Sequence, residues 1–212
     1  MAYETVGDLI KAFRDDERDT VQPYFWSDGQ LVRWANEALT EFAERTESIY
    51  DTESPVTRID YAKGEGEFAL DPCVLDVVGA WVEGHRRIHL VRGPFRHDWP
   101  CHGFGTQLHF DSVGILRLHP VPALPGTLKL QVIRRPLREL DKCDRIPDIM
   151  PTDRRHLLGW MAYKAYRVNE GDTYNRGSSD EHLQRLEEAC QAARERGILR
   201  RGDCSRPIRS HW

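Results

Sequence analysis

Hydrophobic positions in the first fifty residues recur with the spacing of amphipathic helices. Thr5 is a suitable N-cap for a first helix over residues 6–16, whose apolar side carries Leu9, Ile10 and Phe13. The run Ser27-Asp28-Gly29-Gln30 has the S-x-x-Q form of a capping box and predicts a second helix that lasts to about Tyr50. Seven apolar residues form or border its stripe: Leu31, Trp34, Ala35, Ala38, Leu39, Phe42 and Ile49.

Between residues 53 and 145 the apolar and polar positions alternate in short runs, as they do in strands that bury one face. The expected strands cover residues 56–61, 67–70, 74–83, 87–91, 107–110, 114–118 and 128–134. Gly84-His85 marks a hairpin, and residues 92–105 are expected to form a loop rich in Gly, Pro and His. This pattern predicts an antiparallel sheet or a small sandwich with one wet face.

Helical spacing returns after Pro147 and Pro151. Thr152 is the expected cap of a helix over residues 153–169. Ser178-Ser179-Asp180-Glu181 contains a second capping box, which predicts a helix from there to Arg196 with Gly197 as its stop. The remaining residues, 198–212, offer little to bury and are expected to be disordered in the free chain.

These elements predict an α+β protein in which an antiparallel β section is inserted into a helical core. The core is expected to consist of N-terminal helices in residues 1–52 and C-terminal helices in residues 146–197, with the β section in residues 53–145. A flexible basic arm, residues 198–212, would follow. A chain of 212 residues buries enough surface to hold such a core without metals or disulfides.

Charge is balanced overall but divided unevenly along the chain. The 30 Lys and Arg residues against 34 Asp and Glu residues give a net charge of −4, which argues against wholesale electrostatic binding to nucleic acid. Residues 1–60 carry 14 acids and 6 bases, and the last stretch, Arg194 to Trp212, carries six arginines against Glu195 and Asp203. Either the two ends meet different partners, or acidic helix faces and a basic tail are simply solvated.

Candidate catalytic chemistry is sparse, and we expect neither an enzyme nor a cofactor. The five cysteines contain no CxxC pair, and the nearest metal-like cluster, His97, Cys101 and His102, lacks a fourth ligand and is expected to be a surface loop. Nucleotide-binding, hydrolase and zinc-protease motifs are missing from the sequence. No apolar run approaches about 18 residues, so no membrane span is expected. The N-terminus also lacks the basic start and apolar stretch of a signal peptide.

Three helical stretches resemble the head-to-tail adaptor (connector) proteins of short-tailed bacteriophages and their prophages. They are residues 5–10, Thr-Val-Gly-Asp-Leu-Ile, residues 24–38, with Trp-Ser-Asp before a helix containing Trp-Ala-Asn-Glu-Ala, and the late run from Ile146-Pro147 through Ala162-Tyr163-Lys164-Ala165-Tyr166 to residues 172–175. The likeness covers about residues 5–50 and 146–196, and these motifs are helix-packing signatures.

The resemblance implies a structural virion protein without catalytic or metal-binding residues. Such adaptors assemble after DNA packaging as a ring, expected to be twelve-fold, on the portal vertex in the virion neck, and they give the tail its docking surface. The implied partners are the portal protein, the tail nozzle or tail tube protein and further copies of the chain, with DNA passing through the lumen and host cytoplasm as the place of assembly. No membrane is involved.

Two groups of residues follow from the resemblance and the helical pattern together. The portal-docking arm is expected to use Arg200, Arg201, Arg206, Ile208, Arg209 and Trp212. Helix packing or the ring interface is expected to use Trp26, Leu31, Trp34, Ala38, Phe42, Leu157, Trp160, Met161, Tyr163 and Tyr166.

Two other interpretations stay open at this point. A neck or head-completion protein of a long-tailed phage would assemble on a similar ring but meet a different tail. A DNA-binding module would use the basic C-terminal tail on DNA phosphates, and its binding would weaken steeply as salt rises.

Overall fold

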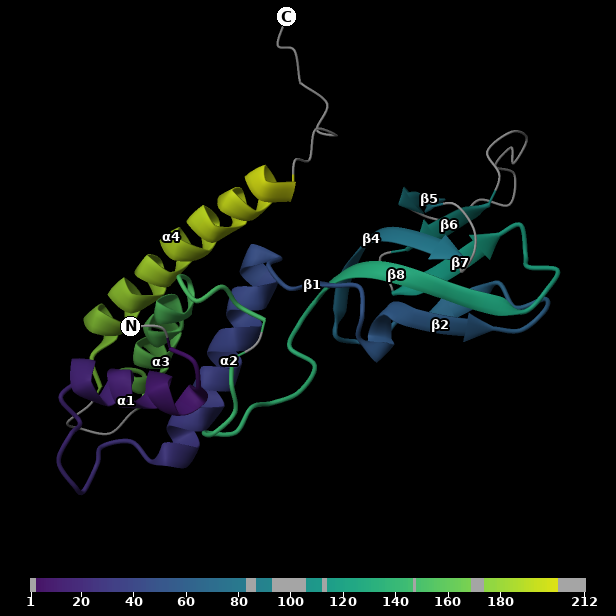
Figure 1. The fold of residues 1–212 in the computed structure, drawn as a ribbon. Helices are drawn as coiled ribbons and strands as arrows, with labels where there is room; N and C mark the ends of the chain where they lie inside the picture. The colour runs from purple at the N-terminus through teal and green to yellow at the C-terminus, as the bar shows by residue number, and fades with distance from the viewer. Residues whose placement is uncertain are drawn as a thin grey trace, which may run out of the picture. The chain divides into compact units, whose positions relative to one another are not determined.

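The structure is a computed structural model that describes residues 3–82, 87–92, 106–111, 114–146, 148–168 and 174–201. The chain divides into two compact units, which are described separately. A helical unit comprises residues Met1–Ser48 and Arg138–Trp212, and a β unit comprises Ile49–Leu137. The predicted α+β class, with a β section inserted between two groups of helices, is confirmed (Figure 1).

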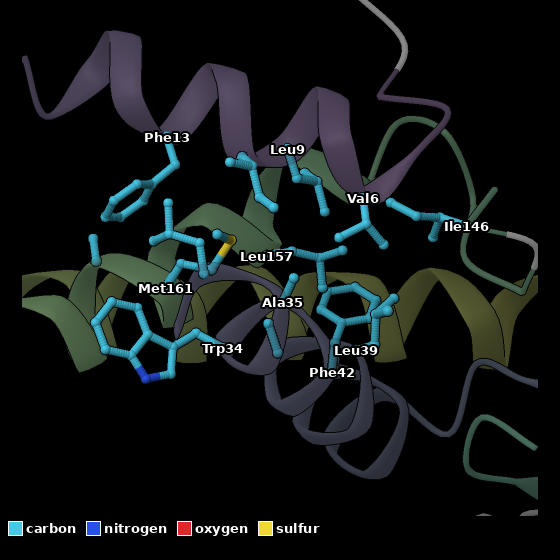
Figure 2. Packing of buried hydrophobic residues seen from close by; sticks show 14 of the residues in the cluster. Val6, Leu9, Phe13, Trp34, Ala35, Leu39, Phe42, Ile146, Leu157 and Met161 are labelled. Carbon is cyan, nitrogen blue, oxygen red and sulfur yellow. The ribbon is translucent and has the colours of Figure 1, made fainter. Parts of the chain in front are cut away.

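The helical unit contains α1 (Val6–Asp16), α2 (Asp28–Thr46), α3 (Leu157–Ala165) and α4 (Arg176–Arg201), with a short 3-10 turn at Arg154–His156 before α3. Helix α3 packs against both α2 and α4, and α1 covers α2 and α3. Figure 2 shows the resulting core, where side chains of α1, α2 and α3 converge. Its largest members with less than 2% exposure include Phe13, Phe42, Leu157 and Met161.

Both N-terminal caps form as the sequence predicts. The Thr5 hydroxyl accepts the backbone N–H of Asp8, and the Asp8 carboxylate accepts the N–H of Thr5 in return. Ser27 and Gln30 make the same reciprocal pair at the start of α2. The predicted end of α2 near Tyr50 is wrong, because Glu47 adopts a left-handed conformation (φ 51°) that stops the helix at Thr46.

All four predicted boundaries of the C-terminal helices are wrong. The first of these helices, α3, ends at Ala165 and not at residue 169. Helix α3 begins only at Leu157, and no side chain caps it or the 3-10 turn before it. The predicted cap, Thr152, is exposed. Its neighbour Asp153 is buried and accepts a hydrogen bond from Arg196 at 2.6 Å. Helix α4 begins at Arg176 because Asn175, and not Ser178, caps it by accepting the N–H of Ser178. The helix also continues through Gly197 to Arg201, and the remainder of the expected arm lies outside the described residues.

The chain that returns from the β unit is bound to the helical unit by its backbone. The N–H groups of Val6 and Gly7 donate to the carbonyl oxygens of Asp144 and Lys142 at 3.1 and 2.8 Å, which satisfies two donors at the start of α1. The Asn36 side chain exchanges two hydrogen bonds with the backbone of Leu140, at 2.7 and 2.9 Å. Residues 140–144 therefore pack with the helices, although the sequence pattern groups them with the strands.

The β unit is built on eight described strands whose bounds are β1 (Tyr50–Asp51), β2 (Arg58–Tyr61), β3 (Glu67–Ala69), β4 (Val74–Val82), β5 (Arg87–Arg92), β6 (Gln107–Phe110), β7 (Ile115–His119) and β8 (Gly126–Arg134). Their order in the sheet is β1-β8-β4-β5-β6-β7-β3, and β2 also pairs with β8. Val56 and Thr57, predicted as the start of a strand, belong to a 3-10 turn at Pro55–Thr57 instead. Alternate side chains on these strands form a separate apolar core that includes Val77, Leu108, Leu116, Leu130 and Val132.

The predicted all-antiparallel pairing is wrong at one position. β4 and β5 pair antiparallel, as the predicted hairpin requires, but β5 and β6 run parallel, with Leu90 opposite Leu108. A parallel pair needs a longer connection than a hairpin, and the residues that make this connection, 93–105, lie outside the described residues. None of the described helices is long and apolar enough to cross a membrane.

Candidate protein-interaction surfaces

Seven of the ten residues predicted for helix packing or a ring interface are buried in the core of the helical unit. These are Trp26, Leu31, Trp34, Ala38, Phe42, Leu157 and Met161, each at most 3% exposed. A side chain with no exposed surface contacts no other chain while the unit is folded, so these seven act in helix packing. Trp160, Tyr163 and Tyr166 stay partly exposed and lie at the edge of that core.

Cationic side chains cover the exposed aromatic face of α3. The rings of Trp160 and Tyr163 lie 5.1 Å apart. Arg45 from α2 lies over the Trp160 ring at 5.5 Å, and Arg167 lies over the Tyr163 ring at 4.8 Å. Such cation–π contacts contribute about 0.5–1 kcal/mol each at exposed sites and keep the rings out of full contact with water.

A groove of about 590 Å³ opens between α1, α3 and α4, and we call it the α1–α3–α4 groove. Its apolar lining includes Phe13, Leu158, Ala162 and Leu186, and its polar lining comprises Asp16, Glu17, Arg155, His156, His182 and Arg185. The helices α3 and α4 lie close together beside it: a Cβ at Gly159 would lie 3.5 Å from the Cβ of Leu186, an ordinary van der Waals contact.

One end of this groove is organised by Tyr166. Its hydroxyl donates a hydrogen bond to the Glu17 carboxylate, and its ring stacks on His182 with the centroids 5.8 Å apart. Burial, together with the negative charge of Glu17, raises the pKa of Tyr166 to about 12, so the phenol stays protonated and remains a donor. Burial also lowers the pKa of His156, which favours its neutral form.

The connection between α1 and α2, residues 17–27, is held by a buried arginine that the sequence analysis missed. Arg14 is 8% exposed and donates hydrogen bonds to the carboxylate of Asp19, to the carbonyl oxygen of Trp26 at 3.0 Å and to Asp28 at 2.7 Å. The other Asp19 oxygen accepts the N–H of Phe25 at 2.8 Å. The available signal was that Arg14 follows Ile10 by four residues, on the apolar face of α1.

This connection, which we call the α1–α2 loop, nevertheless exposes three large apolar side chains. Val21 is 76%, Phe25 57% and Tyr24 40% exposed. The Arg14 guanidinium lies 3.8 Å from the centroid of the Tyr24 ring. The ring centroids of Phe25 and the buried Trp26 lie 5.9 Å apart. An apolar cluster that a hydrogen-bonded network holds at the surface is typical of an interaction site.

The predicted portal-docking arm lies mostly outside the described residues. Arg206, Ile208, Arg209 and Trp212 are outside them, and of Arg200 and Arg201 the structure describes only the helical backbone of α4. Just before them, Arg194 pairs with Glu47 at 2.5 Å and Arg196 with Asp153 at 2.6 Å. Leu199 is 81% exposed, so the last turn of α4 extends beyond the core of the unit.

No group of three His, Cys, Asp or Glu side chains in the described part of the chain is arranged to hold a metal ion. The candidate cluster His97, Cys101 and His102 falls outside that part. The exposed apolar side chains of the α1–α2 loop are typical of a protein that contacts other proteins.

Comparison with known families identifies the class of that protein as a structural adaptor of bacteriophages. A family model described as SU10 adaptor protein matches residues 4–209. The match covers almost the whole chain, and the chain therefore belongs to the SU10 adaptor protein family. The resemblance to phage head-to-tail adaptors, which rests on helical motifs, is thereby confirmed, and the match extends it across the strands and the basic tail. No curated protein matches the chain.

Proposed function

We propose that the protein assembles after DNA packaging as a ring on the portal vertex, where it forms part of the virion neck and provides the surface on which the tail docks. The observation that carries this proposal is the family match over residues 4–209. A ring needs two different surfaces on each chain, one for each neighbour. The helical unit offers several: the aromatic face of α3, the α1–α3–α4 groove and the apolar α1–α2 loop.

We assign portal contact to the C-terminal arm beyond α4. The exposed Leu199 and the length of α4, which continues to Arg201, support this assignment because both present the arm at the edge of the helical unit. Residues 198–212 hold four arginines against one acid, Asp203, and therefore suit an acidic surface on the portal. Arginine at an interface rim raises the association rate and fixes register through complementary charge.

Light scattering coupled to size-exclusion chromatography tests the ring, first on the chain alone and then with portal. The expected result is one large complex. Its mass minus the mass of the portal alone is expected to equal a whole number of adaptor chains. A chain that never comigrates with portal would contradict the proposal. Duplex-DNA binding that falls steeply with salt, without portal binding, would instead support the DNA-binding interpretation.

Two variants test the arm separately from the fold. Truncation after Arg201 keeps α4 whole, and Arg206→Glu with Arg209→Glu reverses two charges in the arm. Both are expected to weaken portal binding at least tenfold and to leave the thermal unfolding of the chain unchanged. The matched control reverses Arg33 and Arg176, whose side chains are 65% and 77% exposed and whose ion pairs with Glu37 and Asp180 are long, at 3.8 Å. Equal losses in the control and the arm variant would contradict the assignment.

A further inference from the structure

Helix α4 extends past the core that holds it. Ala193 is the last described side chain of α4 that is buried in the helical unit, but the helix continues to Arg201. At 1.5 Å per residue, the part after Ala193 is about 12 Å long. Gly197 lies within it and weakens it, because glycine loses more backbone freedom in a helix than other residues do. A helix end of this kind frays unless side chains tether it.

Two ion pairs tether this part of α4, and they differ in burial. Arg194 donates a hydrogen bond to Glu47 at 2.5 Å, but the two side chains are 50% and 36% exposed, so water screens the pair. Arg196 donates to Asp153 at 2.6 Å, and the Asp153 side chain is only 11% exposed. A buried carboxylate that loses its cation costs much more than an exposed one does. The Arg196–Asp153 pair is therefore the stronger tether.

The stronger tether is fixed to the unit through the turn before α3. The N–H of Asp153 donates to the carbonyl oxygen of Met150 at 2.8 Å, and the carbonyl oxygen of Asp153 accepts the N–H of His156 at 3.0 Å. On the other side, Arg196 lies one helical turn before the exposed Leu199. The pair thus joins an ordered turn to the last turns of α4 and sets the direction in which the helix leaves the unit.

We propose that Arg196 and Asp153 are positioning residues for portal binding: their ion pair keeps the last turns of α4 helical and presents Leu199 and the following arm to the portal in one direction. This inference rests on the assignment of portal contact to the arm. Without the pair, the residues from Gly197 to Arg201 become ordered only when portal binds. The entropy cost of that ordering then lowers the affinity.

Arg196→Gln in the full chain tests the proposal, with portal binding measured by biolayer interferometry. The dissociation constant is expected to rise about tenfold or more. Arg194→Gln breaks the exposed pair at the same end of α4 and is the matched control, with an expected change of less than about threefold. Arg196→Lys keeps a cation beside Asp153 and is expected to restore most of the affinity. Equal losses in the three variants would overturn the proposal.

Hydrogen exchange of the free chain separates positioning from folding. In the Arg196→Gln variant, the amides of residues 197–201 are expected to exchange faster, while those of residues 183–190 in the same helix keep the rates of the unchanged chain. Faster exchange throughout α4 would mean that the pair holds the fold as a whole, which contradicts a positioning role.

The truncation after Arg201 tells a failure of this inference from a failure of the proposed function. If the truncation weakens portal binding but Arg196→Gln does not, the inference is wrong and the assignment of the arm stands. If the truncated chain binds portal as well as the full chain does, the assignment of the arm fails, and the positioning role fails with it.

Discussion

Arg14 and Asp19 form an ion pair that is almost completely buried in the helical unit. Arg14 is 8% exposed and Asp19 is 2% exposed. The pair closes the turn after α1 and leads the chain into α2, because Arg14 also binds the carbonyl oxygen of Trp26. A buried pair contributes little net stability compared with an apolar replacement, but the loss of one partner is costly. Its role is to fix the path of the α1–α2 loop.

Arg14→Ala is expected to lower the free energy of unfolding by about 3–5 kcal/mol, because it leaves the Asp19 carboxylate buried without its cation. Urea denaturation followed by circular dichroism measures the loss. Arg33→Ala, which removes a 65% exposed arginine from α2, is the control and should cost less than about 0.5 kcal/mol. Similar losses in the two variants would show that Arg14 does not hold the loop.

The β unit is expected to lose stability in acid through Asp51. Burial by itself raises the pKa of Asp51, but hydrogen bonds from Ser54, the Glu53 backbone and Arg134 outweigh it and hold the pKa well below its ordinary value. The stabilisation is therefore complete above about pH 4, the ordinary pKa of aspartate, and is lost as the pH falls toward the folded-state pKa.

Asp51→Asn is expected to remove part of this acid dependence and to cost on the order of 3 kcal/mol at pH 7. Urea unfolding at a series of pH values between 7 and 2.5 measures both effects. Glu53→Gln changes an exposed neighbour and serves as the control. An unchanged pH slope in the Asp51 variant would mean that other carboxylates govern the acid transition.

Phe42→Ala is expected to destabilise the helical unit by about 3–5 kcal/mol, since the phenyl ring has no exposed surface and its loss leaves a cavity in the core (Figure 2). Leu124→Ala, which shortens a 75% exposed side chain, should change the free energy of unfolding by less than about 0.5 kcal/mol. Thermal and urea unfolding of both variants decide this. Retention of full stability by the Phe42 variant would contradict the packing in Figure 2.

Gly29→Ala is expected to stabilise the chain by up to about 1 kcal/mol. Gly29 lies in the first turn of α2, and an added Cβ there meets no atom within 4 Å, so the alanine gains helix propensity without a clash. Gly126→Ala provides the contrast, because its Cβ would lie 2.5 Å from the hydroxyl oxygen of Tyr61, which must shift. The melting temperatures are expected to move in opposite directions.

Cysteine labelling is expected to separate the described thiols. Burial raises the pKa of Cys190 and of Cys73 to about 11 in each case, which suppresses the reactive thiolate at neutral pH. Cys143 is exposed. Brief treatment with iodoacetamide at pH 7.5 should therefore alkylate Cys143 well before Cys190, as peptide mass spectrometry would show, and urea should abolish the difference. Equal rates in the folded chain would contradict the burial of Cys190.

Local patterns in the sequence determined the start of each N-terminal helix, most of the strands and the α+β class. Thr5, Ser27 and Gln30 act within a few residues of their own backbone, so their spacing is sufficient to predict the caps. The apolar stripe of α2 likewise predicts which side of that helix is buried. The resemblance to phage adaptors also came from helical motifs, because these lie in contiguous stretches of the chain, and the family match over residues 4–209 confirmed it.

The tertiary structure decided the features that join residues far apart in the chain. Asn175 caps α4, and the Ser179 hydroxyl donates to the Tyr163 carbonyl oxygen at 3.0 Å, so the serines of the Ser-x-x-Glu motif lie inside the helix and not at its start. The parallel pairing of β5 and β6 could not be predicted from the sequence. Apolar and polar residues alternate in the same way in a strand that pairs parallel and in one that pairs antiparallel. The groove and the apolar surface of the α1–α2 loop exist only once α1 packs on α3 and Arg14 binds Asp19, because periodicity reports which face is buried but not what it packs against.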